Sequence, residues 1–149
     1  MTKSERLTPV TKLVESKERD AARLLAEAQR LIDEREERLV ELLGYLSEYQ
    51  QRLQAVGSAG VEAGQMQDYH LFIGKLDEAI MLQKKLVVAA KNAFEERKRA
   101  WLVTRTACKA VGKVVERYYK EETLRIVLRE QGESDDRAQY IRRKHEDEE

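Results

Sequence analysis

The chain has 149 residues, and its 28 Lys and Arg side chains balance 28 Asp and Glu side chains, so its formal net charge is zero. Ala, Glu, Lys, Leu and Arg together supply 81 residues, or 54%, a composition typical of coiled coils and long helices. One proline, seven glycines and a single cysteine exclude an all-β fold, a collagen-like chain and a disulfide scaffold, and the balanced charge argues against a chain built mainly to bind nucleic acid.

The first helix is expected to begin at Thr8, an acceptable N-cap residue that places Pro9 at the first helical position. The N-terminal segment before it lacks the apolar run of ~7–15 residues that marks a secretory signal. The longest apolar run of the chain, residues 86–90, is far shorter than the ~20 residues that span a bilayer. We therefore expect a cytoplasmic protein without direct membrane insertion.

Within the first helix, predicted over about residues 9–56, apolar side chains recur at alternating intervals of four and three residues. This heptad repeat predicts one continuous seam that faces a partner helix. Ten of the eleven seam positions are apolar or aromatic. The positions are Ala21, Leu25, Ala28, Ile32, Arg35, Leu39, Leu42, Leu46, Tyr49, Leu53 and Val56.

A turn is predicted over residues 57–64, where three glycines fall within eight residues. A second helix is then predicted over about residues 65–130, and its seam is apolar or aromatic at twelve of fifteen positions. These positions are Tyr69, Ile73, Leu76, Ile80, Gln83, Val87, Ala90, Phe94, Arg97, Trp101, Thr104, Cys108, Val111, Val115 and Tyr118.

Two long helices joined by a short turn are expected to fold back on each other, so the predicted fold is all-α: a long antiparallel two-helix coiled coil. With the turn centred near residue 60.5, position i of the first helix should face position 121 − i of the second. Residues 1–130 then form a single hairpin domain. Residues 131–149 begin with a Gly-containing polar break and are predicted to be a disordered tail.

No catalytic, metal or cofactor site is predicted. Neither histidine, His70 or His145, has a Cys, Asp or Glu at the spacing of a helical metal site that also faces a shared pocket. Cys108 falls in the seam without a nearby base. The glycines follow a helix rather than a strand, which excludes a phosphate-binding loop. The seam residues Arg35 and Gln83 are predicted to share a polar layer that sets the helix register.

The charges are unevenly placed along the second helix. Residues 97–120 contain eight basic residues against Glu116 alone, a net charge of +7. Such a stretch can be a solvated face, or it can attract an acidic protein channel or nucleic acid. Because few aromatic side chains are available to stack on bases, the protein partner is favoured and no nucleic acid is expected.

A second surface follows one side of the second helix. Phe72, Leu76, Ala79 and Gln83 are spaced at intervals of four, three and four residues. Leu76 and Gln83 belong to the seam, whereas Phe72 and Ala79 flank it and widen the apolar stripe. Phe72 either shields the edge of the seam or forms part of a docking patch for another protein.

The chain resembles the flagellar FliJ family, the small coiled-coil component of the type III export apparatus. The resemblance rests on several short motifs on both sides of the turn. In order, they are Asp20-Ala21-Ala22-Arg23-Leu24-Leu25, Leu42-Leu43-Gly44-Tyr45, Glu48-Tyr49, Asp68-Tyr69, Phe72-Ile73, Leu76-Asp77, Ala79-Ile80 and Gln83. The similarity covers roughly residues 20–90, and beyond them only helical character and basic charge agree.

This resemblance implies a non-catalytic hairpin similar to the central stalk of rotary ATPases. Such a hairpin sits in the pore of the hexameric export ATPase, promotes its activity and contacts the cytoplasmic domain of the export gate. It is also linked to recycling of export chaperones, and it associates peripherally with the inner membrane through the apparatus. The family's gate-binding stripe corresponds here to Phe72, Leu76, Ala79 and Gln83.

The contact with the ATPase ring has no sharp motif, and the charge distribution places it on six basic residues. These are Arg97, Arg99, Arg105, Lys109, Lys113 and Arg117. Two alternatives stay open at this point: the homologous stalk of a virulence type III secretion system, and a general coiled-coil adaptor.

Overall fold

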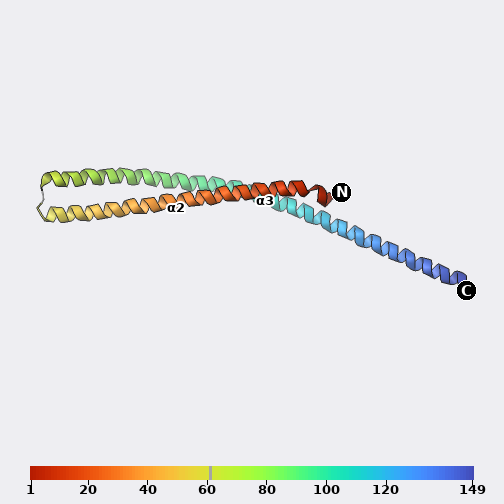
Figure 1. Cartoon of the computed structure of the whole chain (residues 1–149). Coiled ribbons are helices and arrows are strands. Elements are labelled where there is room, and N and C mark those ends of the chain that lie inside the picture. Colours follow the sequence, from red (N-terminus) through yellow and green to blue (C-terminus); the bar gives the residue numbers. More distant parts are fainter. Residues whose placement is uncertain (61) are drawn as a thin grey trace. The chain divides into compact units, whose positions relative to one another are not determined.

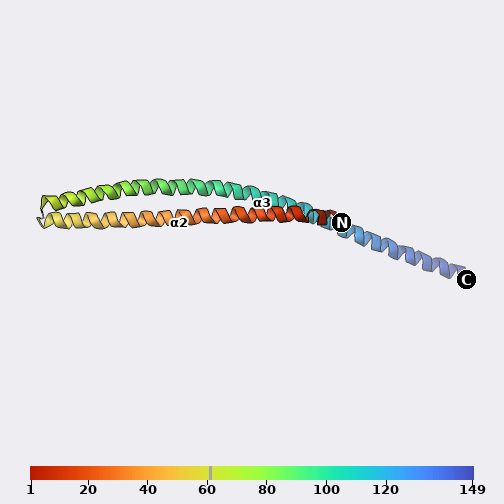
Figure 2. The same ribbon diagram turned by 45° about the horizontal axis from the view of Figure 1, so that its top comes forward.

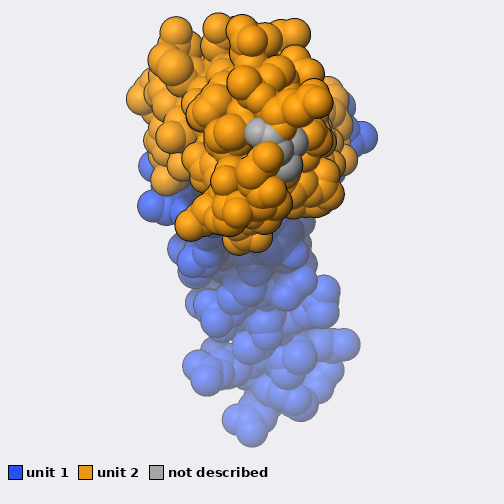
Figure 3. All heavy atoms as spheres, turned by 90° about the vertical axis from the view of Figure 1, so that its left-hand side faces the viewer, with its two compact units in different colours: residues 1–18, 103–149 blue, residues 19–102 orange. Residues whose placement is uncertain are grey.

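The computed structural model describes residues 1–60 and 62–149, and it is 95% helical. Helix α1 spans Lys3–Arg6, α2 spans Thr8–Ser58 and α3 spans Ala63–Glu148, with no strand among the described residues. Contacts divide the chain into two compact units (Figure 3): unit 1 contains Met1–Glu18 and Val103–Glu149, and unit 2 contains Arg19–Leu102. The two long helices pack against each other, which confirms the predicted all-α helical hairpin.

In unit 2 the segments of α2 and α3 run antiparallel and side by side, as both ribbon views show (Figures 1 and 2). The Tyr49 and Phe72 ring centroids are 4.5 Å apart, and the Arg35 guanidinium donates a 2.8 Å hydrogen bond to the Leu86 carbonyl. The residue numbers of each pair sum to 121. The predicted register of the two helices is therefore confirmed in this unit.

The predicted seam is the buried face of both helices. All eleven α2 positions are buried or half-buried, as are fourteen of the fifteen α3 positions. Arg97 is the exception: its side chain is exposed, because a long charged side chain extends into water at the edge of a two-helix seam. The most deeply buried apolar residues are Ile32, Leu42, Leu76, Ile80, Val87 and Ala90.

The helices extend further into the predicted turn than expected. Helix α2 continues to Ser58 and α3 begins at Ala63, so Gly57 and Gly64 are helical rather than turn residues. A single glycine costs a helix only about 1 kcal/mol, which continued hydrogen bonding of the helix can offset. Gly60, with φ of +72°, makes the sharp change of direction, and Val61 of the predicted turn lies outside the described residues.

The N-terminal segment differs from the expectation that the first helix begins with Thr8 as its N-cap. The short helix α1 precedes it, with the Thr2 and Glu5 side chains forming a reciprocal capping box. Leu7 supplies the carbonyl that accepts a 2.8 Å hydrogen bond from the Thr11 amide. Thr8 is consequently the first residue inside α2 rather than its N-cap.

In unit 1 the N-terminal segment of the chain contacts α3 through polar side chains. The Ser4 amide and hydroxyl donate hydrogen bonds of 3.1 and 2.7 Å to the Glu122 carboxylate, and Arg105 lies 4.0 Å from Glu18. The predicted seam positions of the second helix end at Tyr118, and these contacts extend the pairing by one turn to Glu122.

The expected break and disordered tail are replaced by helix, because α3 continues without interruption to Glu148. Apart from Gly132, residues 129–148 are compatible with a helix, and oppositely charged side chains recur at favourable spacings. Every residue from Thr123 onward is exposed. The assignment of residues 1–130 to one hairpin domain stays a prediction.

Candidate functional site

The first candidate surface lies in unit 2 around Phe72, whose side chain is 41% exposed. Its ring rests on Tyr49 of α2, which also approaches the Tyr69 ring at 6.3 Å. The Arg52 guanidinium lies 5.2 Å from the centre of the Tyr49 ring, a cation–π contact. These side chains line a shallow hollow together with Gln65 and Asp68. The surface thus presents an aromatic centre with charged groups at its edge.

The other three residues of the predicted stripe lie on the same side of α3 but differ in exposure. Leu76 is only 8% exposed and belongs to a buried cluster with Leu42 and Ile80. Ala79 packs against this cluster and is half-buried. Of the stripe's large apolar side chains, therefore, Phe72 is the one available to another protein, while Leu76 is buried within the hairpin. The stripe's role in binding stays a prediction.

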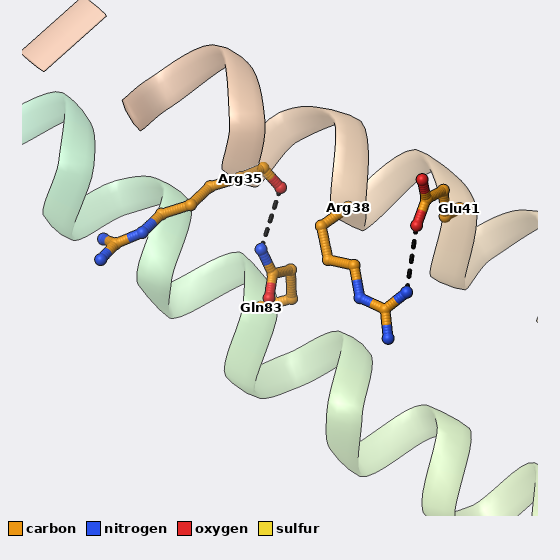
Figure 4. Close-up of polar contacts among 4 residues, drawn as sticks. All are labelled: Arg35, Arg38, Glu41 and Gln83. Atoms are coloured by element: carbon orange, nitrogen blue, oxygen red, sulfur yellow. Dashed lines mark hydrogen bonds and ion pairs between the residues drawn. The ribbon is translucent and has the colours of Figure 1, made fainter. Parts of the chain in front are cut away.

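Gln83, the fourth residue of the stripe, forms the predicted polar layer with Arg35 (Figure 4). Its side-chain amide donates a 3.0 Å hydrogen bond to the Arg35 carbonyl across the seam. The Arg35 side chain in turn reaches the Leu86 carbonyl of α3. Each helix thus donates one side-chain hydrogen bond to the backbone of the other. Such a layer favours one register, because sliding either helix would leave these groups without their partners.

The second candidate surface is the basic face of α3. In unit 1, Arg105, Lys109, Lys113 and Arg117 are exposed. Arg105 is partly neutralised by Glu18, and the Arg117 guanidinium lies 5.6 Å from the centre of the Tyr118 ring.

The remaining two predicted ring-contact residues, Arg97 and Arg99, belong to unit 2 and are also exposed. All six basic side chains are therefore accessible in their own units. Their role in binding the ATPase ring stays a prediction.

The contact between Ser4 and Glu122 was missed by sequence reasoning. Hydrogen bonds from the Ser4 side chain, and then from its backbone, lower the pKa of the Glu122 carboxyl below its ordinary value. Lys3 adds a cation–π contact, with its ammonium 5.4 Å from the centre of the Tyr118 ring. Extending the heptad backward from Ala21 reaches Ser4, and extending it forward from Tyr118 reaches Glu122. The signal was therefore present in the spacing, although both residues are polar.

Among residues 1–60 and 62–149, no group of three or more His, Cys, Asp or Glu side chains is placed to hold a metal ion. Within the same residues, no helix is long and apolar enough to cross a membrane.

Comparisons with known proteins show the family to which the chain belongs. The family model described as "Flagellar FliJ protein" matches residues 2–146. The Flagellar FliJ protein of Escherichia coli (strain K12) is 33% identical over 105 residues, which cover 64% of this chain and 71% of that protein. No solved structure matches the chain significantly. Because the family model covers nearly the whole sequence, the chain belongs to the flagellar FliJ protein family, whose members are components of the flagellar export apparatus.

Proposed function

We propose that this chain is the non-catalytic stalk of the flagellar type III export ATPase. In this role it enters the pore of the hexameric ring, promotes ATP hydrolysis and couples the ring to the cytoplasmic domain of the export gate. The observation that carries the proposal is the family match over residues 2–146. The match to a flagellar family model also favours the flagellar apparatus over a virulence secretion system or a general adaptor.

The antiparallel packing of α2 and α3 supports a stalk role. Two paired helices form an element only about 20 Å across, since each helix with its side chains is ~10–12 Å wide. The heptad seam holds them together, and the polar layer of Arg35 and Gln83 opposes sliding. A narrow element with a fixed register can transmit force or rotation from one partner to another.

The basic residues of α3 are the proposed contacts with the ring. Exposed cations steer a stalk toward an acidic channel, and they act over roughly 8–10 Å at physiological salt. The proposed contacts are Arg97 and Arg99 of unit 2 and Arg105, Lys109, Lys113 and Arg117 of unit 1.

The ring contact is tested by ATP hydrolysis of the purified export ATPase from the same bacterium. Added chain should raise the hydrolysis rate, and the chain alone should show none. The double variant Lys109→Glu, Lys113→Glu should lose most of the stimulation, because it reverses two charges on the proposed contact surface. The matched control Lys84→Glu, Lys85→Glu changes the net charge equally at exposed positions of unit 2 and should stimulate normally. Equal loss in both variants would contradict a localised contact.

Phe72 is the proposed anchor for the export gate, because it is an exposed aromatic side chain backed by Tyr49. Phe72→Ala should weaken binding to the purified cytoplasmic gate domain about tenfold or more, as expected for an aromatic anchor that becomes buried in the complex. Leu71→Ala is the matched control, since Leu71 is 60% exposed and points from a different side of the same turn. Both variants should melt nearly as the wild type does. Normal gate binding by Phe72→Ala would contradict this assignment.

Two further parts of the proposal follow from the family alone. The chain would take part in recycling export chaperones, and it would lie in the cytoplasm, associated peripherally with the inner membrane through the apparatus. A pull-down from the native cell should recover the export ATPase and the gate together with chaperones. Recovery of a virulence-system ATPase instead would support the alternative stalk role.

A further inference from the structure

Among the described residues of unit 1, no helix covers the part of α3 from Thr123 onward. All residues from Thr123 onward are exposed, including large apolar side chains such as Leu124 and Ile141, which are 58% and 56% exposed. Figure 1 shows this blue end of α3 continuing without a neighbouring helix. A helix of this length with exposed apolar side chains is expected to find a partner that covers them.

The exposed apolar residues do not continue the hairpin seam, and three of them, Leu124, Val127 and Ile141, fall on a new one. Continued past Glu122, the hairpin spacing reaches Arg125, Arg129, Gly132 and Asp136, which are unsuited to a buried seam. A different set of positions, spaced alternately by three and four residues, is free of charge although 13 of the 25 residues from Lys120 to Lys144 are charged. We name this set the terminal stripe; it comprises Leu124, Val127, Gln131, Ser134, Ala138 and Ile141.

We propose that the terminal stripe binds the same stripe of a second copy of this chain, with the two helices antiparallel. The two-fold axis would pass between residues 132 and 133, so that stripe position i of one copy faces stripe position 265 − i of the other. Leu124 then meets Ile141 of the second copy, and Val127 meets Ala138. Gln131 and Ser134 form the two central layers, where their side chains can hydrogen-bond across the axis.

Charge complementarity is the reason to favour a second copy in this orientation. In an antiparallel pair, the flanking residues that directly precede the seam positions of one helix lie opposite the residues that directly precede them in the other helix. The residues that directly follow the seam positions pair with each other in the same way. Glu130 then faces Arg137 of the second copy, and Glu121 faces Arg142. Two-fold symmetry doubles each ion pair, which makes four attractive contacts in all.

The parallel arrangement is disfavoured by the same charges. When two copies run parallel, the row before the seam meets the row after it, five residues further along the second chain. Glu130 would then face Asp135 of the second copy, and Arg137 would face Arg142. Both contacts are repulsive and both occur twice. The sequence of charges therefore distinguishes the two orientations by sign.

Association is tested on the full chain by sedimentation equilibrium over a range of concentrations. The wild type should show a reversible monomer–dimer equilibrium. Ile141→Asp should weaken dimerisation about 100-fold or more, because each dimer would bury two carboxylates at the seam. The matched control Tyr140→Asp introduces the same charge at a residue that is 69% exposed and lies off the stripe, and it should leave the dimer largely intact.

Orientation is tested by a charge exchange. Glu130→Arg should weaken the antiparallel dimer about tenfold, since two ion pairs become two repulsions. Adding Arg137→Glu to the same chain should restore the wild-type affinity. In a parallel dimer, Glu130→Arg would instead strengthen association, because the introduced guanidinium would then face Asp135 of the second copy.

Three results would overturn the proposal. They are a wild-type chain that stays monomeric at all concentrations, equal effects of Ile141→Asp and Tyr140→Asp, and tighter association of Glu130→Arg. Because sedimentation uses the isolated chain, these outcomes are independent of the ATPase and gate contacts proposed above. Capture of a different protein by the stripe, without self-association, would likewise assign the surface to another partner.

Discussion

The two units of the chain differ in the contacts that hold each of them together. All six of the most deeply buried apolar residues belong to unit 2, which also contains the polar layer of Arg35 and Gln83. In unit 1 the helices meet through half-buried apolar side chains, with Ser4 bonded to Glu122 and Arg105 close to Glu18. Hydrophobic burial is worth far more than exposed ion pairs, so unit 2 should supply most of the stability.

This difference separates the unit that stabilises the fold from the unit that carries most of the proposed binding surfaces. Unit 2 has the buried core needed to fix the register of the helices. Unit 1 carries four of the six proposed ring-contact cations and the terminal stripe, and both are surfaces that need accessible side chains. A weakly cored unit is also free to open and close locally without unfolding the whole chain.

The largest effect is expected from truncating the core of unit 2. Ile80 is 5% exposed and packs with Leu42 and Leu76, so Ile80→Ala should cost about 2–4 kcal/mol of unfolding free energy. Val111→Ala, at a half-buried seam position of unit 1, should cost about 1 kcal/mol or less. Urea unfolding followed by circular dichroism measures both. Equal losses would show that the two units contribute alike to stability.

A smaller loss is expected from the polar layer. Gln83→Ala removes the hydrogen bond to the Arg35 carbonyl and should cost about 1 kcal/mol. This variant should also loosen the register of α2 against α3, because the polar layer loses one of its two cross-helix hydrogen bonds. Spin labels at Leu31 and Met81, both exposed, should report a broader distance distribution in the variant than in the wild type. An unchanged distribution would show that the apolar seam alone sets the register.

Replacing a glycine inside a helix with alanine should raise the unfolding free energy by about as much as Gln83→Ala lowers it, or slightly less. A Cβ added at Gly74 meets no atom within 4 Å, so Gly74→Ala should stabilise α3 by about 0.5–1 kcal/mol. Gly60→Ala is the contrasting variant, since its φ of +72° strains any residue with a Cβ, and it should destabilise the chain. Thermal melting followed by circular dichroism compares the two. A loss of stability in Gly74→Ala would show that the added methyl group does not fit beside α3.

Most of the fold could be predicted from the sequence because a heptad repeat records the buried face directly. Residues such as Leu42 and Ile80 are both apolar and correctly spaced, and the turn fixes which positions face each other. The limits of the helices were less predictable. Gly57, Gly64 and Gly132 are helix-weakening residues, but the hydrogen bonds of long helices continue through them.

The candidate surfaces were only partly predictable. The heptad spacing places Leu76 in the seam and Phe72 beside it, but spacing alone does not show how much of the Phe72 side chain its neighbours leave exposed. The Ser4–Glu122 contact escaped prediction for another reason. Sequence reasoning reads seams from apolar residues, and this last layer of the seam is polar.

The smallest effect concerns the polar layer between Ser4 and Glu122. Because Ser4 hydrogen bonds lower the pKa of Glu122, the carboxylate holds α1 at neutral pH, and this contribution is lost as pH falls through the lowered pKa. The Ser4 amide resonance should therefore shift on acidification below the ordinary carboxyl pKa of about 4.5. Glu122→Gln should abolish this pH-dependent shift while leaving the urea midpoint of the whole chain nearly unchanged. If the midpoint instead fell as far as in Ile80→Ala, unit 1 would depend on this contact as unit 2 depends on its core.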